Sequence, residues 1–393
     1  MTTVEKDSKP LIIDADSHLI EPPDLWTSRV SDKFADACPR VERHPVTKAS
    51  HWRIGDHWLW PVGHWGHAGY SQYAPTQPRE MEEMDPAAYD AKVRLERMDQ
   101  YGIDQEILYP NIVGFEAPVL RDQLGGEAAI ECIKVYNDYS LEWTQADPAR
   151  LTSIAMLPYW SREASVAEMR RCIEKGHRGV LFANKFERIG LPNFCDEYWD
   201  PVYAVAQELK IPVNYHVGFT GELVDYVTPE KIFERRGGGR QARLDRALAH
   251  ASGGQKHLEA GRIITSGICD RFPELKFVSV ESGFGYIPYY LECLDWEWQA
   301  GGALTPGELL PSEYFRRQCY GSLWFETTTL PLLELYPDNF MFSTDFPHPT
   351  SLSPGPASPA KVPSEHVEKY YGDLKPETRR KVLSGNAQTL YGI

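Results

Sequence analysis

Short apolar runs alternate with helix-like segments about eight times along the 393 residues, which predicts an α/β protein folded as a (β/α)₈ TIM barrel. The runs are almost wholly apolar, as parallel strands are when both faces of the sheet are covered. No glycine-rich dinucleotide fingerprint follows the first run, which disfavours an open, doubly wound sheet. We therefore expect residues 1–393 to form one barrel domain with insertions after strands one and five.

The first strand begins at Leu11, and the segment 22–84 that follows it is irregular and rich in Trp, His, Pro and Gly. Within this segment, alternation over residues 51–60 predicts a hairpin with Gly55 near its turn. A long irregular segment inside a compact fold is usually functional, so we expect 22–84 to form a lid or a pocket wall. Its many Trp side chains indicate an apolar or aromatic small-molecule ligand.

From residue 85 the pattern becomes regular, because Asp85-Pro86 marks the start of an amphipathic helix that ends at Gly102. Further helices are expected over 126–146, 162–175, 197–209, 255–272, 285–297 and 376–390. Strands are expected over 106–110, 152–158, 179–183, 211–216, 275–281, 323–326 and 339–345. The charged segment 218–254 is expected to be a mobile insertion loop. The proline-rich stretch 347–363 is expected to be a stiff loop that either completes the rim or packs against another subunit.

Charge and cysteine content limit the partners and the compartment. The sequence has 41 Lys and Arg against 56 Asp and Glu, a net charge of −15, which argues against nucleic acid or an anionic membrane as the main partner. Seven scattered cysteines without a CxxC pair indicate reduced thiols rather than a disulfide framework or a zinc knuckle. With a polar N-terminus and no membrane-spanning stretch, the sequence predicts a cytoplasmic protein.

Polar residues recur where the predicted strands end, which is the face that carries the chemistry of such barrels. The first strand ends in alternating polar residues that share one face, and strands five, six and eight also end in ligand-type side chains. These residues are Asp14, Asp16, His18, His216, Glu281 and Asp345, with His348 just beyond the last strand. Singly, His216 could bond within a loop, Glu281 could pair with an Arg, and Asp345 could cap a turn. Their occurrence on one rim favours a site for a divalent cation.

The histidines of segment 22–84 are rival metal ligands. They include His51, His57, His64 and His67. Spacings such as His64-x-x-His67 in a glycine-rich loop are weak evidence for a metal site, and we interpret these side chains mainly as polar rims on an aromatic pocket.

Several motifs resemble the amidohydrolase superfamily. The similarity is to the amidohydrolase-related branch, which includes hydrolases and also the non-oxidative decarboxylases of aminocarboxymuconate semialdehyde and resorcylate. The motifs are Ile13-Asp14-Ala15-Asp16-Ser17-His18, His216, Glu281-Ser282-Gly283 and Ser343-Thr344-Asp345-Phe346-Pro347-His348, with Gly385-Asn386-Ala387 near the C-terminus. Two positions depart from the branch. Asp16-x-His18 replaces His-x-His or Glu-x-His, and Glu281 stands where the decarboxylases commonly have His.

The resemblance implies a metal-dependent enzyme. Asp16, His18, His216 and Asp345 would hold one or two divalent ions, with Zn expected and Mn or Fe as alternatives. Asp345 would transfer protons, Glu281 would be a further ligand or an acid/base group, and His348 would orient Asp345. Lys185 invites comparison with the bridging lysine of binuclear members, and a homodimer is expected.

Three functions follow from this resemblance. We expect a metal-activated water to hydrolyse an amide, ester or thioester of a small apolar or aromatic carboxylate-type substrate. The alternative is non-oxidative decarboxylation of an aromatic or muconate-type acid. A non-catalytic binding protein on the same barrel is the third possibility.

Overall fold

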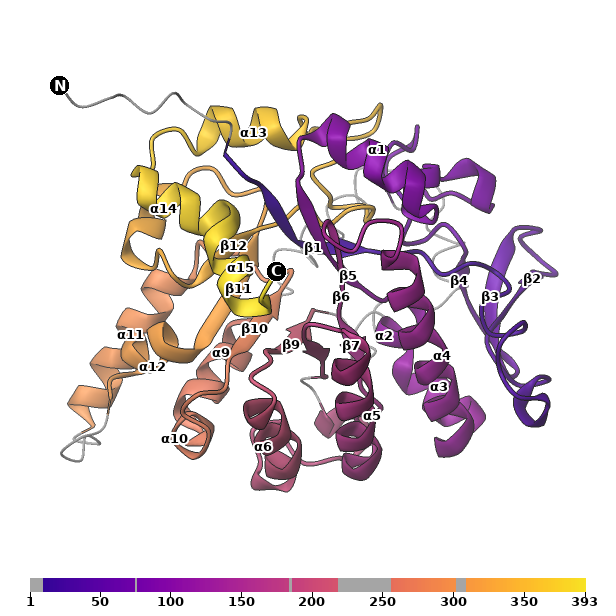
Figure 1. The fold of residues 1–393 in the computed structure, drawn as a ribbon, viewed down its shortest axis with the longest axis horizontal. Helices are drawn as coiled ribbons and strands as arrows, with labels where there is room; N and C mark the ends of the chain where they lie inside the picture. Colours follow the sequence, from indigo (N-terminus) through magenta and orange to yellow (C-terminus); the bar gives the residue numbers. More distant parts are fainter. Residues whose placement is uncertain (1–9, 75, 184–185, 218–255, 302–308) are drawn as a thin grey trace.

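The computed structural model describes residues 10–74, 76–183, 186–217, 256–301 and 309–393. Figure 1 shows strands at the centre of the molecule, helices around them and a small separate sheet at one side. The central strands are parallel and lie in the orders β1-β5-β6 and β7-β8-β9-β10-β11-β12. Their bounds are β1 Ile13–His18, β5 Gln105–Tyr109, β6 Leu151–Ser153, β7 Ala155–Met156, β8 Val180–Leu181, β9 Val213–His216, β10 Phe277–Val280, β11 Cys319–Leu323 and β12 Phe340–Phe342.

Two junctions join these strands into a ring. Only Ile154 separates β6 from β7, and its N–H donates to the carbonyl of Leu108 on β5 at 3.1 Å, so β6 and β7 act as one interrupted strand. At the other junction, Ser17 of β1 forms a parallel bridge with Phe346, and the His18 N–H donates to the Phe346 carbonyl at 2.6 Å. The predicted (β/α)₈ barrel is confirmed.

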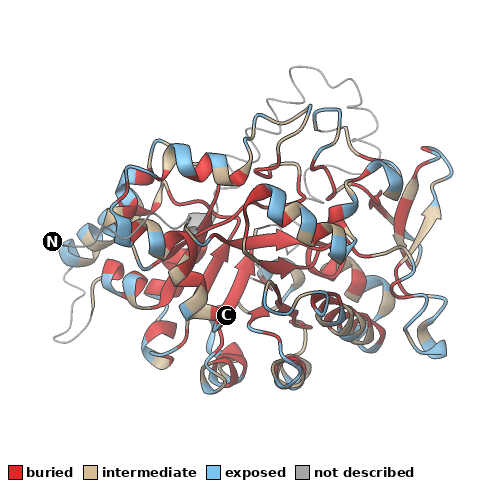
Figure 2. Ribbon diagram, turned by 45° about the horizontal axis from the view of Figure 1, so that its top comes forward, coloured by how far each residue is buried: buried red, intermediate tan, exposed pale blue. Residues whose placement is uncertain are grey.

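Helices cover the outside of the ring, and buried residues concentrate on the strands and on the inner faces of the helices (Figure 2). The longer helices are α1 Ala91–Tyr101, α3 Ala117–Leu124, α4 Gly126–Thr144, α5 Arg162–Lys175, α6 Asp200–Glu208, α9 Lys256–Thr265, α11 Ile287–Ala300, α12 Pro311–Gln318 and α13 Pro363–Tyr370. The shorter ones are α2 Ile112–Phe115, α10 Ile268–Arg271, α14 Pro376–Arg380 and α15 Asn386–Tyr391. Among the helices described, none combines the length and the apolar character that a membrane crossing requires.

Local capping explains why some helix boundaries could be predicted. The helix predicted over 162–175 has those bounds, because Ser161 accepts the N–H of Ala164 at 3.2 Å and Gly176 follows the last turn. Gly102 ends α1 in the left-handed region at φ 72°, as predicted. That helix begins later than expected, at Ala91, since a single 3-10 turn occupies residues 86–88.

The strand predicted over 323–326 is misplaced. The structure places β11 at Cys319–Leu323, directly after α12. Beyond it, the side chain of Glu326 folds back and accepts the N–H groups of Trp324 (3.1 Å) and Phe284 (2.6 Å), which draws this segment out of the sheet. Helices α2, α3, α12 and α13 were also not predicted, and the closing helix 376–390 is interrupted by a π-helical turn at Lys381–Gly385.

The segment 22–84 contains the predicted hairpin. β3 (Ser50–Ile54) and β4 (His57–Pro61) pair antiparallel with a turn at Gly55, and β2 (Arg40–Arg43) adds a third strand. The buried indole of Trp26 donates to the carbonyl of Cys132 on α4 at 2.9 Å, which anchors the segment to the barrel. The expected loop 218–254 lies outside the described residues. Residues 347–362 form no helix or strand up to the start of α13.

Candidate metal centre

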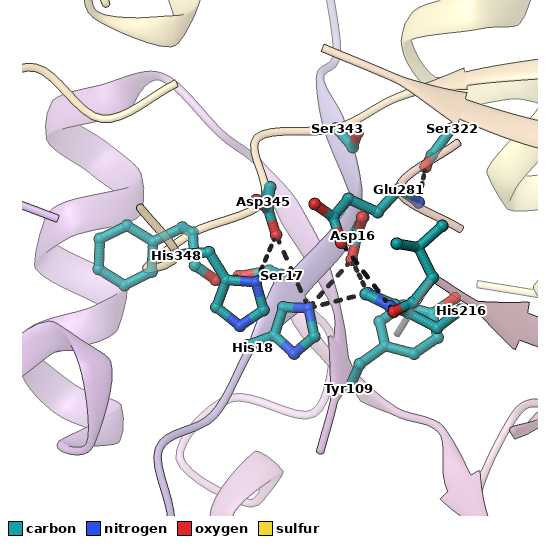
Figure 3. Close-up of polar contacts among 12 residues, drawn as sticks. Asp16, Ser17, His18, Tyr109, His216, Glu281, Ser322, Ser343, Asp345 and His348 are labelled. Carbon is teal, nitrogen blue, oxygen red and sulfur yellow. Dashed lines mark hydrogen bonds and ion pairs between the residues drawn. The ribbon is translucent and has the colours of Figure 1, made fainter. Parts of the chain in front are cut away.

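Three ligand-type side chains from two strands meet at the carboxyl ends of the barrel strands (Figure 3). Asp16 and His18 extend from the same side of β1, and His216 ends β9. The Nε2 atoms of the two imidazoles lie 3.2 Å apart. One oxygen of Asp16, Oδ1, is 3.4 Å from Nε2 of His18 and 3.6 Å from Nε2 of His216. All three side chains are buried, and the geometry brings together the residues predicted to converge.

The remaining ring nitrogens define the tautomers of the two histidines. Nδ1 of His18 lies 3.2 Å from the Pro110 carbonyl, and Nδ1 of His216 lies 2.7 Å from the Val217 carbonyl. A carbonyl only accepts, so each Nδ1 carries a proton and each Nε2 faces the centre. Neither carboxylate oxygen of Asp16 accepts a hydrogen bond within the described residues. A buried carboxylate without a hydrogen bond is costly, and one carboxylate with two imidazole nitrogens is a donor set that fits a divalent cation.

Burial and neighbouring groups act in opposite directions on the pKa values of the centre. Burial raises the pKa of Asp16, but the contacts with His18 and His216 outweigh it and hold that pKa below its ordinary range. Burial, together with the nearby His348, lowers the pKa of His18 well below its usual value. Burial also opposes protonation of His216, but Asp16 raises the pKa of this ring above its usual value. The centre therefore holds an ionised carboxylate between two imidazoles.

Asp345 and His348 form the second half of the cluster, from the segment that follows β12. Oδ1 of Asp345 is 3.8 Å from Nε2 of His18 and 2.8 Å from Nδ1 of His348. The rings of His18 and His348 stack with centroids 3.8 Å apart and planes at 26°. His18, Asp345 and His348 are a second buried group whose ligand atoms lie close enough together to hold a metal ion, and the 2.8 Å contact places Nδ1 of His348 against Asp345. Nε2 of His348 lies 2.8 Å from Oδ1 of Asn111.

Glu281 follows β10 and lies beside the cluster. Its Oε2 is 3.8 Å from Nδ1 of His216, the ring nitrogen that faces away from the centre. Its backbone is in the left-handed region at φ 53°, and its N–H donates to Oγ of Ser322 at 2.8 Å. Figure 3 shows the side chain extending toward Asp16, which places a further carboxylate at this end of the barrel.

Three histidines of segment 22–84 form side-chain hydrogen bonds with neighbours in that segment. Nδ1 of His51 lies 2.8 Å from the Leu59 carbonyl, and its Nε2 lies 2.9 Å from Oγ1 of Thr47. His64 and His67 contact Gln77 and the Thr76 carbonyl in the same way. Among the described residues, the groups of three side chains that could hold a metal ion do not include these histidines.

The same segment supplies an aromatic wall beside the cluster. The ring of Trp65 stacks on Phe115 with centroids 4.2 Å apart and planes at 14°, and its centroid is 5.4 Å from that of His348. Phe115 in turn packs edge-on against His216 at 5.4 Å. Trp65 therefore gives the segment an aromatic contact with the site, in addition to the backbone hydrogen bonds from His67 and Ala68 to the Pro347 carbonyl.

Two residues of the site were not predicted from sequence. Asn111 directly follows the end of β5, so the rule that located Asp345 and His216 could also have found it. Arg94 lies on the apolar face of the helix predicted from residue 85. A charged residue on such a face is rarely buried without a partner, so its position could have indicated a buried ion pair. Lys185, the predicted counterpart of a bridging lysine, lies outside the described residues.

Comparison with known proteins supplies the family. The amidohydrolase family profile matches residues 13–393. The chain is 27% identical over 318 residues to a gamma-resorcylate decarboxylase of Polaromonas sp., an alignment that spans 77% of this chain and 87% of the relative.

Solved structures share the fold. An amidohydrolase of Mycobacterium avium subsp. paratuberculosis superimposes with a TM-score of 0.71 at 20% identity, covering 98% of this chain and all (100%) of that one. A dihydroxybenzoic acid decarboxylase of Polaromonas sp., solved with manganese and the inhibitor 2-nitroresorcinol, gives a TM-score of 0.58 at 20% identity and covers 98% and 97%. Because the family profile spans nearly the whole chain, this protein belongs to the amidohydrolase family.

Proposed function

We propose that this chain catalyses the metal-dependent, non-oxidative decarboxylation of a small aromatic hydroxy acid. The observation that carries the proposal is the similarity, over 77% of the chain, to a curated enzyme named as a decarboxylase. It favours the alternative function over the hydrolysis that the sequence motifs first suggested. The buried carboxylate–imidazole cluster supports the proposal because it combines metal-type ligands with an acid that could protonate carbon.

Asp16, His18, His216 and Asp345 would hold the cation through two nitrogens and two carboxylates. Zn²⁺, Mn²⁺ and Fe²⁺ all accept such donors, and the manganese in the Polaromonas decarboxylase makes Mn²⁺ the first ion to test. A cation bound there supplies positive charge that neutralises and orients the carboxylate of the substrate or a neighbouring phenolate oxygen. Glu281 would be an additional carboxylate on the same rim.

The proton for the reaction would be held between Asp345 and His348. The Nδ2 group of Asn111 donates to the Leu19 carbonyl, so its Oδ1 faces Nε2 of His348 and that nitrogen carries a proton. Nδ1 of His348 then faces Oδ1 of Asp345 at 2.8 Å, and one proton is shared between them. Transfer of this proton to the ring carbon that bears the carboxylate allows the carbon–carbon bond to break. CO₂ leaves, and the electron pair of that bond restores the aromatic ring.

The aromatic wall would bind the ring of the substrate. Phe115 and Trp65 are almost completely buried and present apolar surface beside His348. Apolar walls with a few polar groups are typical of small-molecule sites, and they exclude water from the reacting carbon.

The decisive experiment measures CO₂ release from 2,6-dihydroxybenzoate and 2-hydroxybenzoate by the Mn²⁺-loaded protein, beside hydrolysis of phenyl esters and anilides. We expect CO₂ and the corresponding phenol, and a loss of about 10²-fold or more in Asp345→Asn. Asp56→Asn is the matched control, because its side chain is 98% exposed at the hairpin turn. Ester or amide cleavage without CO₂ would replace decarboxylation by hydrolysis. Metal-loaded protein inactive on every aromatic acid tested would reject the substrate class.

A further inference from the structure

We propose that Arg94 is a positioning residue of the metal centre, because its guanidinium holds the end of β1 in the conformation that directs Asp16 and His18 to the cation. The inference rests on the metal centre of the proposed function and adds a residue from outside the ligand set. Arg94 lies on α1, is fully buried and contacts the backbone of a proposed ligand.

The guanidinium binds the two residues at the end of β1. Nη2 of Arg94 donates to the carbonyl of His18 at 2.7 Å, and Nη1 donates to Oγ of Ser17 at 2.9 Å. Ser17 lies between Asp16 and His18, so these contacts fix the chain at and between the two proposed ligands of this strand. Hydrogen bonds from a charged donor are stronger than those between neutral groups, particularly in a buried site.

The other contacts of Arg94 tie this end of β1 to the surrounding fold. Nη1 also pairs with Oε2 of Glu106 on β5 at 2.7 Å, and Nε donates to the Ala87 carbonyl at 2.6 Å. The guanidinium carbon lies 4.3 Å from the ring centroid of Phe346, the residue after Asp345. One side chain therefore contacts β1, β5, the turn before α1 and the segment that follows β12.

The strand needs this support because its pairing is irregular at the ligands. The register between β1 and β5 shifts between Asp14 and Ser17, so the regular hydrogen-bond ladder is interrupted around Asp16. At His18, the N–H is held by the Phe346 carbonyl at 2.6 Å and the carbonyl is held by Arg94. Within the described residues, the peptide after His18 would without Arg94 be held only by the Leu19 N–H, which donates to the Tyr109 carbonyl at 3.3 Å. The backbone that carries the ring of His18 would then be fixed less firmly relative to His216.

The shape of the guanidinium makes the proposal specific. Arg presents a rigid planar fork that can bind the Ser17 hydroxyl, Glu106 and the His18 carbonyl at once, whereas the single ammonium of Lys cannot reach all three. Arg94→Lys keeps the charge that pairs with Glu106 but removes the fork. Residues that orient metal ligands typically change metal affinity by about 10–100-fold when mutated.

The test measures binding of Mn²⁺ and Zn²⁺ alone to wild type, Arg94→Lys and the control Arg171→Lys, beside the melting temperature of each metal-free protein. Arg171 also pairs with a buried glutamate, Glu168, at 2.6 Å, but it lies on α5 and does not contact β1. We expect Arg94→Lys to weaken metal binding by about 10–100-fold. Arg171→Lys should keep wild-type affinity at a comparable melting temperature.

A second variant covers the case in which Arg94→Lys does not fold. Ser17→Ala removes one partner of the guanidinium and leaves its charge paired, and it should weaken metal binding several-fold. Wild-type affinity in folded Arg94→Lys, or in Ser17→Ala if only that variant folds, would overturn the proposal and leave the metal centre intact. A wild-type protein that binds neither ion would remove the metal centre itself, and the role of Arg94 with it.

Discussion

The rim of the barrel and the segment 22–84 are both rich in histidine, but their histidines make different kinds of contact. At the rim, the rings of His216 and His348 both pack against the ring of His18, although the three residues are far apart in sequence. In the segment, the side chains of His51 and His64 form hydrogen bonds with Thr47, the Leu59 carbonyl and Gln77, which all lie in the same segment. The difference teaches that the topology of parallel strands, rather than the local density of ligand-type residues, creates the candidate site.

The physical reason lies in the direction of the strands. Parallel strands end at one edge, so each contributes its last residues to the same small volume, whatever the separation in sequence. In the antiparallel β2–β4 sheet the strand ends alternate, and polar side chains satisfy nearby backbone groups. His51, which bonds to the Leu59 carbonyl across β3 and β4, is an example.

The largest expected difference is between one substitution at the rim and one in segment 22–84. Asp16→Asn removes the ionised carboxylate between the two imidazoles, and we expect Mn²⁺ affinity to fall by about 100-fold or more, because even residues outside the ligand set contribute 10–100-fold. His51→Phe removes two buried contacts and should lower the free energy of unfolding by about 1–3 kcal/mol while metal affinity is retained. Metal titration and urea unfolding of both variants check the pair, and similar behaviour of the two would contradict it.

Removing the imidazole beside Asp345 should have a smaller effect that separates metal binding from proton transfer. His348→Phe keeps a ring that can stack on His18 but loses the partner of the shared proton. We expect turnover of the aromatic acid to fall by about 10²-fold with metal affinity within a few-fold of wild type. His57→Gln, on the exposed start of β4, is the control and should keep wild-type turnover. A large loss of metal in His348→Phe would instead make His348 a ligand.

The smallest effect concerns Glu116, which connects the two regions. Burial raises its pKa to about 7, although the indole of Trp60 on β4 donates to it at 3.0 Å. The folded protein therefore keeps a proton that the unfolded chain loses above its usual pKa, and stability should fall as the pH rises from about 4.5 to about 7 and then level off.

Glu116→Gln should remove part of that slope, about 1–3 kcal/mol over the interval, as measured by urea unfolding at a series of pH values. Burial raises the pKa of Glu21 to about 7 as well, so a residual slope of the same sign should persist. An unchanged slope in the variant would mean that Glu116 does not titrate in this range.

Much of the fold and of the cluster could be predicted because the signals are local. Alternation placed Asp16 and His18 on one face of β1, and apolar runs placed His216 and Asp345 at strand ends. Glycine and Ser161 fixed helix boundaries. The elements that were missed depend on tertiary contacts. The end of β11 is set by hydrogen bonds from two backbone N–H groups to Glu326, and the role of Arg94 appears only where a helix side chain meets a strand carbonyl.

The hydrogen bonds that close the barrel join opposite ends of the sequence. The N–H of Asp345 donates to the carbonyl of Asp16 at 2.8 Å, and the backbone N–H of Thr344 donates to the carboxylate of Asp14 at 2.8 Å. During synthesis, a nascent chain that has already exposed His18 and His216 still lacks the segment that completes the ring. The proposed ligand set can therefore assemble in full only after the segment that carries Asp345 has been synthesised.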